Sequence, residues 1–242
     1  MPSLEDLNIR SEWVGHQFRV LARSYGWLVK KVGVESLFAN RKGALQYLQY
    51  QFTPITLLLR SQPDMLLRGN SGVEMFEAKA VEDAWDNVAI EAWQLIYLYT
   101  LYRSLGVDTN YVFGWPQHEV LDGVIVPVSL LPLTRFYKPP RFRQWPNQLR
   151  DSLERLVKHY YPDIEIRGLA EGHRGSGDPY FVFTKSNLSQ FQTISHWFVE
   201  RGQQFFGMKD RISWEGQKEA NEVWKSWKYS DWIRVHEKRR PV

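Results

Sequence analysis

The chain has 242 residues, of which 43% are hydrophobic and 24% are charged, and this balance indicates one large globular domain or a domain with an appendage. It contains no cysteine, which excludes disulfide bonds, thiolate metal sites and cysteine nucleophiles. The first residues lack the basic and apolar regions of a secretion signal, and no run approaches about 18 uncharged apolar residues, so we expect a cytoplasmic protein with no membrane span.

The net charge of +4 is unevenly divided along the chain. Residues 1–134 hold eleven Lys and Arg against fourteen Asp and Glu, whereas residues 135–242 hold twenty against thirteen. An acidic half that can hold cations, followed by a basic half, is typical of proteins that bind polyanions. The alternative is a surface whose charge is uneven without a functional reason.

Apolar residues at steps of three and four positions predict a helix over residues 3–31, with a break at Gly26 that leads into either a short strand or the last turn of the helix. The other elements predicted in the first half are, in chain order, a helix at 45–51, strands at 55–60, 63–68 and 73–81, a helix at 83–105, and strands at 109–115 and 123–131. This order predicts an α/β fold, in which a central mixed β-sheet is flanked by helices.

A basic segment rich in proline, residues 131–146, predicts a division of the chain at residue 134/135. Residues 1–134 would form the core, and residues 135–242 would form a basic, aromatic-rich region that is mainly α-helical. Its predicted elements are helices at 147–160, 188–206 and 215–229 and strands at 164–169 and 179–185.

Two charged residues occupy one face of the predicted strand at 73–81. Because side chains alternate along a strand, Glu77 and Lys79 lie together on the face opposite Ala78. Burying both side chains costs free energy unless they are paired or bind something. Asp64 and Glu77, on neighbouring strands, could hold one hard cation such as Mg²⁺, with the backbone carbonyl of Ala78 as a further ligand. Lys79 could then position or deprotonate a water molecule, or stabilise charge on a phosphate.

These residue types together predict metal-assisted hydrolysis of a phosphodiester. The alternative is that Glu77 and Lys79 form a weak ion pair on a solvated edge of the sheet, worth at most about 1 kcal/mol.

The pattern resembles the PD-(D/E)xK nuclease superfamily, which has a restriction-endonuclease-like core. The matching residues are Pro63-Asp64 and Glu77-Ala78-Lys79, on two predicted strands that a Gly/Ser turn joins and a long helix follows. The resemblance covers roughly residues 10–115. It implies that Asp64 and Glu77 bind Mg²⁺, with Mn²⁺ as a substitute, and that Lys79 is catalytic.

Two further positions bear on this resemblance. Members of the superfamily often carry a Gln on the helix after the lysine strand, and Gln94 occupies a similar place, where it would contact the attacking water or a phosphate. The first helix of the family often carries a Glu that completes the metal site, but Arg19 stands at that position here. Glu12 and Glu35 are the alternative sources of a third carboxylate.

Basic residues of the second half are the predicted DNA contacts outside the catalytic core. These residues are Lys138, Arg141 and Arg143 in the Pro-rich segment and Lys238, Arg239 and Arg240 in the tail. A rigid extended chain in the Pro-rich segment could follow a phosphate backbone, and the tail would add non-specific affinity.

The sequence therefore predicts a Mg²⁺-dependent DNA nuclease, and the first interpretation is a sequence-specific endonuclease of the restriction or homing type. Holliday-junction resolvases and repair or recombination nucleases are the second interpretation. The third is a catalytically silent nucleic-acid-binding protein on a nuclease-like fold, which the Arg19 position favours. DNA and a second copy of the chain are the expected partners. No phosphate-binding glycine loop followed by Lys and Ser or Thr is present, so we expect no nucleotide cofactor.

Overall fold

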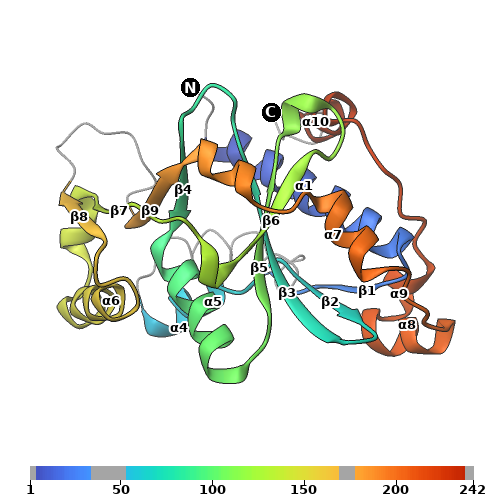
Figure 1. Ribbon diagram of the computed structural model, residues 1–242, viewed down its shortest axis with the longest axis horizontal. Coiled ribbons are helices and arrows are strands. Elements are labelled where there is room, and N and C mark those ends of the chain that lie inside the picture. Colours follow the sequence, from blue (N-terminus) through green and yellow to red (C-terminus); the bar gives the residue numbers. More distant parts are fainter. Residues whose placement is uncertain (1–3, 34–52, 169–177, 238–242) are drawn as a thin grey trace.

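Two β-sheets with helices around them form the computed structural model, which describes residues 4–33, 53–168 and 178–237 (Figure 1). The strands are β1 (Leu28–Lys31), β2 (Met65–Gly69), β3 (Gly72–Ala80), β4 (Asn87–Glu91), β5 (Thr109–Gly114), β6 (Gly123–Pro127), β7 (Arg135–Lys138), β8 (Glu165–Gly168) and β9 (Tyr180–Thr184). The α-helices are α1 (Leu4–Ser24), α4 (Pro54–Arg60), α5 (Ala92–Leu105), α6 (Asn147–Tyr160), α7 (Ile194–Arg201), α8 (Met208–Glu215), α9 (Gln217–Asn221) and α10 (Tyr229–Glu237). Short 3₁₀ helices are η1 (Pro116–His118), η2 (Val128–Leu130), η3 (Pro140–Gln144) and η4 (Lys185–Gln190).

The first sheet has the strand order β1-β2-β3-β5-β6 and contains both parallel and antiparallel pairs. β2 and β3 form an antiparallel hairpin that pairs Met65 with Phe76 and closes between Gly69 and Gly72. β3 and β5 run parallel, and α5 makes the crossover between them. The sequence prediction of an α/β fold with a central mixed sheet is therefore confirmed.

Helices cover both faces of this sheet, and the alternation of side chains along β3 determines which residue meets which helix. Phe76 and Ala78 belong to a core cluster with side chains of α1 and α7, including Phe18 and Phe198. The opposite face packs against α5 in a second cluster, which Tyr111 and Phe113 of β5 join. Glu77, between Phe76 and Ala78, therefore lies on the α5 face.

The second sheet has the order β4-β9-β7-β8 and joins the two halves of the chain. β4 comes from the first half and pairs with β9 from the second, Asn87 opposite Thr184. β8 and α6 lie at one end of the molecule, and α8 and α9 lie at the other (Figure 1). The division at residue 134/135 stays a prediction, although backbone pairing crosses it.

The C-terminal segment packs on α1 and on the edge strand β1. The Glu215 carboxylate, buried at the end of α8, pairs with Arg23 and accepts a hydrogen bond from the Val29 backbone N–H at 2.8 Å. The Trp227 carbonyl accepts one from the Trp13 indole at 3.0 Å. The first contact pairs one backbone N–H on the open edge of β1, and the second holds the segment before α10 against α1.

Local structure differs from the sequence prediction where distant segments supply the pairing. Residues 55–60 form helix α4 rather than a strand, with the Leu57 side chain turned into the core. Residues 83–105 form strand β4 and then helix α5, because β9 offers a hydrogen-bonding partner to the first half of this range. The helix predicted at 45–51 lies outside the described residues.

Three predicted helices are also shorter or divided. The one at 3–31 ends at Ser24, and β1 follows a turn at Gly26, whose φ is +83°. The one at 188–206 is η4 followed by α7, whose N-cap is Thr193. The one at 215–229 is α9, an extended stretch and α10, because polar side chains of α1 bind the backbone of the stretch. No helix in the described part of the chain is long and apolar enough to cross a membrane.

Candidate active site

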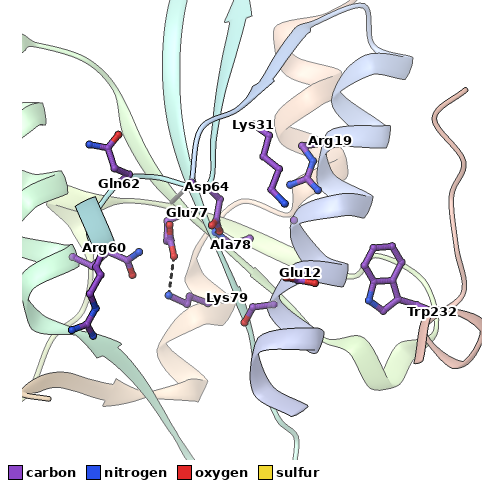
Figure 2. A pocket seen from close by; sticks show the side chains of 14 residues that line it. Glu12, Arg19, Lys31, Arg60, Gln62, Asp64, Glu77, Ala78, Lys79 and Trp232 are labelled. Atoms are coloured by element: carbon purple, nitrogen blue, oxygen red, sulfur yellow. Dashed lines mark hydrogen bonds and ion pairs between the residues drawn. The ribbon is translucent and has the colours of Figure 1, made fainter. Parts of the chain in front are cut away.

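A pocket of about 360 Å³ opens at the end of the first sheet where strand β2 begins. β3 extends past the start of β2, and α1 and α5 flank it on opposite faces. The side chains of Asp64, Glu77 and Lys79 line this pocket, as does Ala78 (Figure 2). Gln94 of α5 lines it as well. The structure thus brings the predicted catalytic residues together, and their catalytic roles stay predictions.

Asp64 is held at the pocket by β1 and by β3. Its backbone carbonyl accepts a hydrogen bond from Val32 at 3.1 Å, and its Oδ2 accepts one from the Ala78 backbone N–H at 2.9 Å. β2 starts one residue later, so no backbone carbonyl of β2 pairs with the Ala78 N–H, and the Asp64 side chain accepts its hydrogen bond instead. In an extended strand the N–H and C=O of one residue point to the same side, so the Ala78 carbonyl is directed towards Asp64.

Glu77 and Lys79 share the α5 face of β3, as predicted from the alternation. Glu77 is 3% exposed, and its Oε1 lies 2.8 Å from Nζ of Lys79 (Figure 2). The alternative of a solvated surface pair is therefore wrong. The other carboxylate oxygen of Glu77, Oε2, is buried and has no hydrogen-bond partner among the described residues. A buried, unsatisfied carboxylate oxygen is costly, which points to a ligand at this place.

The electrostatics of the site oppose ionisation of Glu77 and favour the charged form of Lys79. Burial and the nearby Asp64 carboxylate raise the pKa of Glu77 to about 8, and Lys79 and Gln94 offset this only in part. Burial alone would lower the pKa of Lys79, but Glu77 and Asp64 outweigh it and raise the pKa above its ordinary value. Lys79 therefore carries its proton at neutral pH.

The oxygen atoms at the pocket suit a hard divalent cation. Asp64 and Glu77 supply carboxylates, and the Ala78 carbonyl is directed to the same place. Within residues 4–33, 53–168 and 178–237, no group of three His, Cys, Asp or Glu residues could hold a metal. Glu12 lines the pocket but is exposed, and Glu35 lies outside the described residues.

Sequence reasoning missed two cations of the pocket, Arg60 and Lys31. Arg60, at the end of α4, is 3.1 Å from Glu91 and 2.7 Å from Asp178. Its place in the pocket could not be predicted, because residues 55–60 are predicted to form a strand and because Glu91 and Asp178 are distant in sequence. Lys31 ends β1, in the segment after Gly26 where the sequence leaves a short strand and a last helical turn as alternatives.

The predicted DNA contacts of the second half lie away from this pocket. Lys138, on β7, is 3.3 Å from Glu154 of α6. Arg141 and Arg143 lie on η3, a 3₁₀ helix in place of the extended chain expected there. The Phe142 side chain between them is buried in the core. None of these three lines the pocket. The tail residues Lys238, Arg239 and Arg240 lie outside the described residues.

Comparisons with known proteins give little support for a family. No family model matches the chain, and no curated protein matches its sequence. Among solved structures, the chain is similar to Hjc, a Holliday junction resolvase from the archaeal hyperthermophile Archaeoglobus fulgidus. The match covers 81% of this chain and 98% of that one, with 11% sequence identity and a TM-score of 0.39. This similarity is too low to assign a family.

Proposed function

We propose that this protein is a nuclease that uses a divalent metal ion to hydrolyse phosphodiester bonds of DNA. The observation that carries the proposal is the convergence of Asp64, Glu77 and Lys79 in one pocket at the ends of adjacent strands. A buried carboxylate beside a second carboxylate and a lysine is a costly arrangement for stability alone. Binding and activating a phosphate at a metal ion provides a reason for it.

Asp64, Glu77 and the Ala78 carbonyl would hold the metal, preferably Mg²⁺, with Mn²⁺ as a substitute. When bound, the metal would polarise a phosphate oxygen and lower the pKa of a water molecule. A cation bound there would also favour the ionised form of Glu77, whose pKa burial and the Asp64 carboxylate raise.

The chain's own side chains would position the reacting groups and stabilise charge. Lys79 carries a proton at Nζ, which supports a role as an electrostatic partner of the phosphate in the transition state rather than as a base. The Gln94 amide, buried beside Glu77, could orient the attacking water or a phosphate oxygen. Ser11 of α1 accepts a hydrogen bond from the Ala80 N–H at 3.2 Å and so fixes α1 against this end of β3.

The basic second half and the cations around the pocket support DNA as the substrate. Within the nuclease proposal, a sequence-specific endonuclease cuts duplex DNA at fixed positions, whereas a junction resolvase needs a branched substrate. A catalytically silent protein would bind DNA and cut neither.

A panel of DNA substrates tests this proposal. Linear genomic DNA, supercoiled plasmid and a four-way junction are incubated with wild type and with Asp64→Asn, in Mg²⁺, Mn²⁺ or EDTA. We expect cleavage of at least one substrate by wild type in Mg²⁺ or Mn²⁺, and no cleavage in EDTA or by the variant. Discrete genomic fragments would indicate sequence specificity, and cutting of the junction alone would indicate a resolvase. DNA binding without cleavage of any substrate would contradict the proposal.

A further inference from the structure

The pocket continues over the edge of the sheet from the α5 face to the α1 face. Glu77 and Lys79 lie on one side of Asp64, and Arg19 and Lys31 lie on the other, directed into the same pocket (Figure 2). Arg19 comes from α1 and Lys31 from β1, so two separate elements bring positive charge to this side. This pair of cations has no role in the proposed hydrolysis.

The fold makes room for the Arg19 side chain. Gly15 is one turn earlier on α1, and a Cβ there would lie 3.2 Å from Nη1 of Arg19 and 3.3 Å from Cβ of Ala78. The guanidinium therefore lies over the glycine, close to the strand that carries the motif. Arg19 is only 8% exposed, although it lines the pocket. Arg19 interacts with Glu219 from the adjoining side, and an anionic ligand in the pocket would lie within reach of the same guanidinium.

Lys31 is set beside Asp64 by the pairing of β1 with β2. Its register partner is Met65, the residue after Asp64. Arg19 and Lys31 also line an adjoining hollow of about 240 Å³, where Glu219 and Glu222 supply negative charge. An anion bound by the pair is therefore best placed on the pocket side, away from these two glutamates.

We infer that Arg19 and Lys31 form a second phosphate subsite, which holds the phosphodiester next to the one that is cleaved. This inference rests on the proposed function. Arginine presents a planar fork of donors that matches phosphate oxygens, and lysine adds a point charge. A phosphate held on the α1 face would orient the strand so that its neighbour meets Asp64 and Lys79, since phosphate contacts set the register of a protein on DNA.

The test measures the salt dependence of DNA binding in EDTA, where no cleavage is expected. A fluorescently labelled duplex is titrated with each protein at several NaCl concentrations. Loss of one phosphate contact should reduce the slope of log K against log [NaCl] by about 0.9. We expect this reduction for Arg19→Gln and for Lys31→Gln. Arg19→Lys, which keeps the charge, and Arg103→Gln, at an exposed arginine near the end of α5, should bind with the wild-type slope.

Folding is checked for each variant by thermal unfolding. If Arg19→Gln does not fold, the half-buried Lys31 carries the test. A folded Arg19→Gln or Lys31→Gln with the wild-type slope would overturn the subsite, as would a wild-type protein that does not bind the duplex. The two proposals can fail separately. If the salt slope of binding depends on Arg19 but no substrate is cleaved with any metal, the nuclease proposal is refuted and the phosphate subsite is supported.

Discussion

Glu77 should make the stability of the metal-free protein depend on pH, and Glu77→Gln should remove this dependence. Burial and Asp64 raise the pKa of Glu77 from 4.5 to about 8. Between these values the folded protein holds a proton that the unfolded chain has released, so stability falls as pH rises. The stabilisation that comes from the proton on Glu77 is fully present below the pKa of the unfolded chain. It is lost as pH rises through the raised pKa of the folded protein.

The expected size follows from the pKa difference. One pKa unit corresponds to about 1.4 kcal/mol, so the difference between 4.5 and about 8 sets a ceiling of about 5 kcal/mol. Urea unfolding in EDTA at about pH 5, 6.5 and 8 gives the free energy of unfolding of wild type and of Glu77→Gln. The free energy of unfolding of Glu77→Gln, relative to that of wild type, should rise by roughly 1 kcal/mol for each pH unit across this range.

Titrating groups outside this pocket affect both proteins alike, so the difference between them reports on Glu77 and the groups that interact with it. Glu200→Gln, at an exposed glutamate of α7, provides the control. A difference between wild type and Glu77→Gln that stays constant from pH 5 to 8 would refute the account of a buried, unsatisfied carboxylate. Adding Mn²⁺ at the highest pH should stabilise wild type and leave the variant unchanged, because the cation compensates the charge of Glu77.

Two further substitutions test the frame that positions the pocket. Arg60→Met leaves the buried Asp178 carboxylate and the half-buried Glu91 carboxylate without their cation, so urea unfolding should show a loss of about 2 to 3 kcal/mol. A loss below about 1 kcal/mol would mean that the ion pairs are solvated. Gly26→Ala places a Cβ 1.9 Å from a backbone carbonyl oxygen at a φ of +83°, so it should cost at least about 2 kcal/mol. Gly106→Ala, also at positive φ but with open space around it, should cost about 1 kcal/mol, and equal losses at the two glycines would contradict the predicted clash.

The parts of the site that sequence reasoning could predict are those determined by local pattern. The Gly/Ser turn between two apolar runs predicts the β2–β3 hairpin, and alternation along β3 predicts that Glu77 and Lys79 share a face. The hairpin also places Asp64 beside Glu77, because strands joined by a tight turn pair in a fixed register. The position of Asp64 in the pocket therefore follows from a short stretch of sequence.

The remainder depends on contacts between segments far apart in the chain. β4 is a strand because β9, about ninety residues later, pairs with it, and no local signal distinguishes it from the start of α5. Arg60 enters the pocket through pairing with Asp178, which precedes β9. The segment before α10 is extended because its backbone bonds to side chains of α1, including Trp13. A single sequence does not reveal these pairings.

Nicking of supercoiled plasmid by Lys79→Ala tests the central claim most directly. With Mg²⁺ and protein in excess over DNA, the variant should cut at least about 100-fold more slowly than wild type, because it lacks the positive charge next to Glu77. Its DNA binding in EDTA should stay close to wild type. Lys30→Ala, which removes an exposed lysine of β1, is the matched control and should cut at the wild-type rate. A folded Lys79→Ala that cuts as fast as wild type would contradict the assignment of this pocket as the active site.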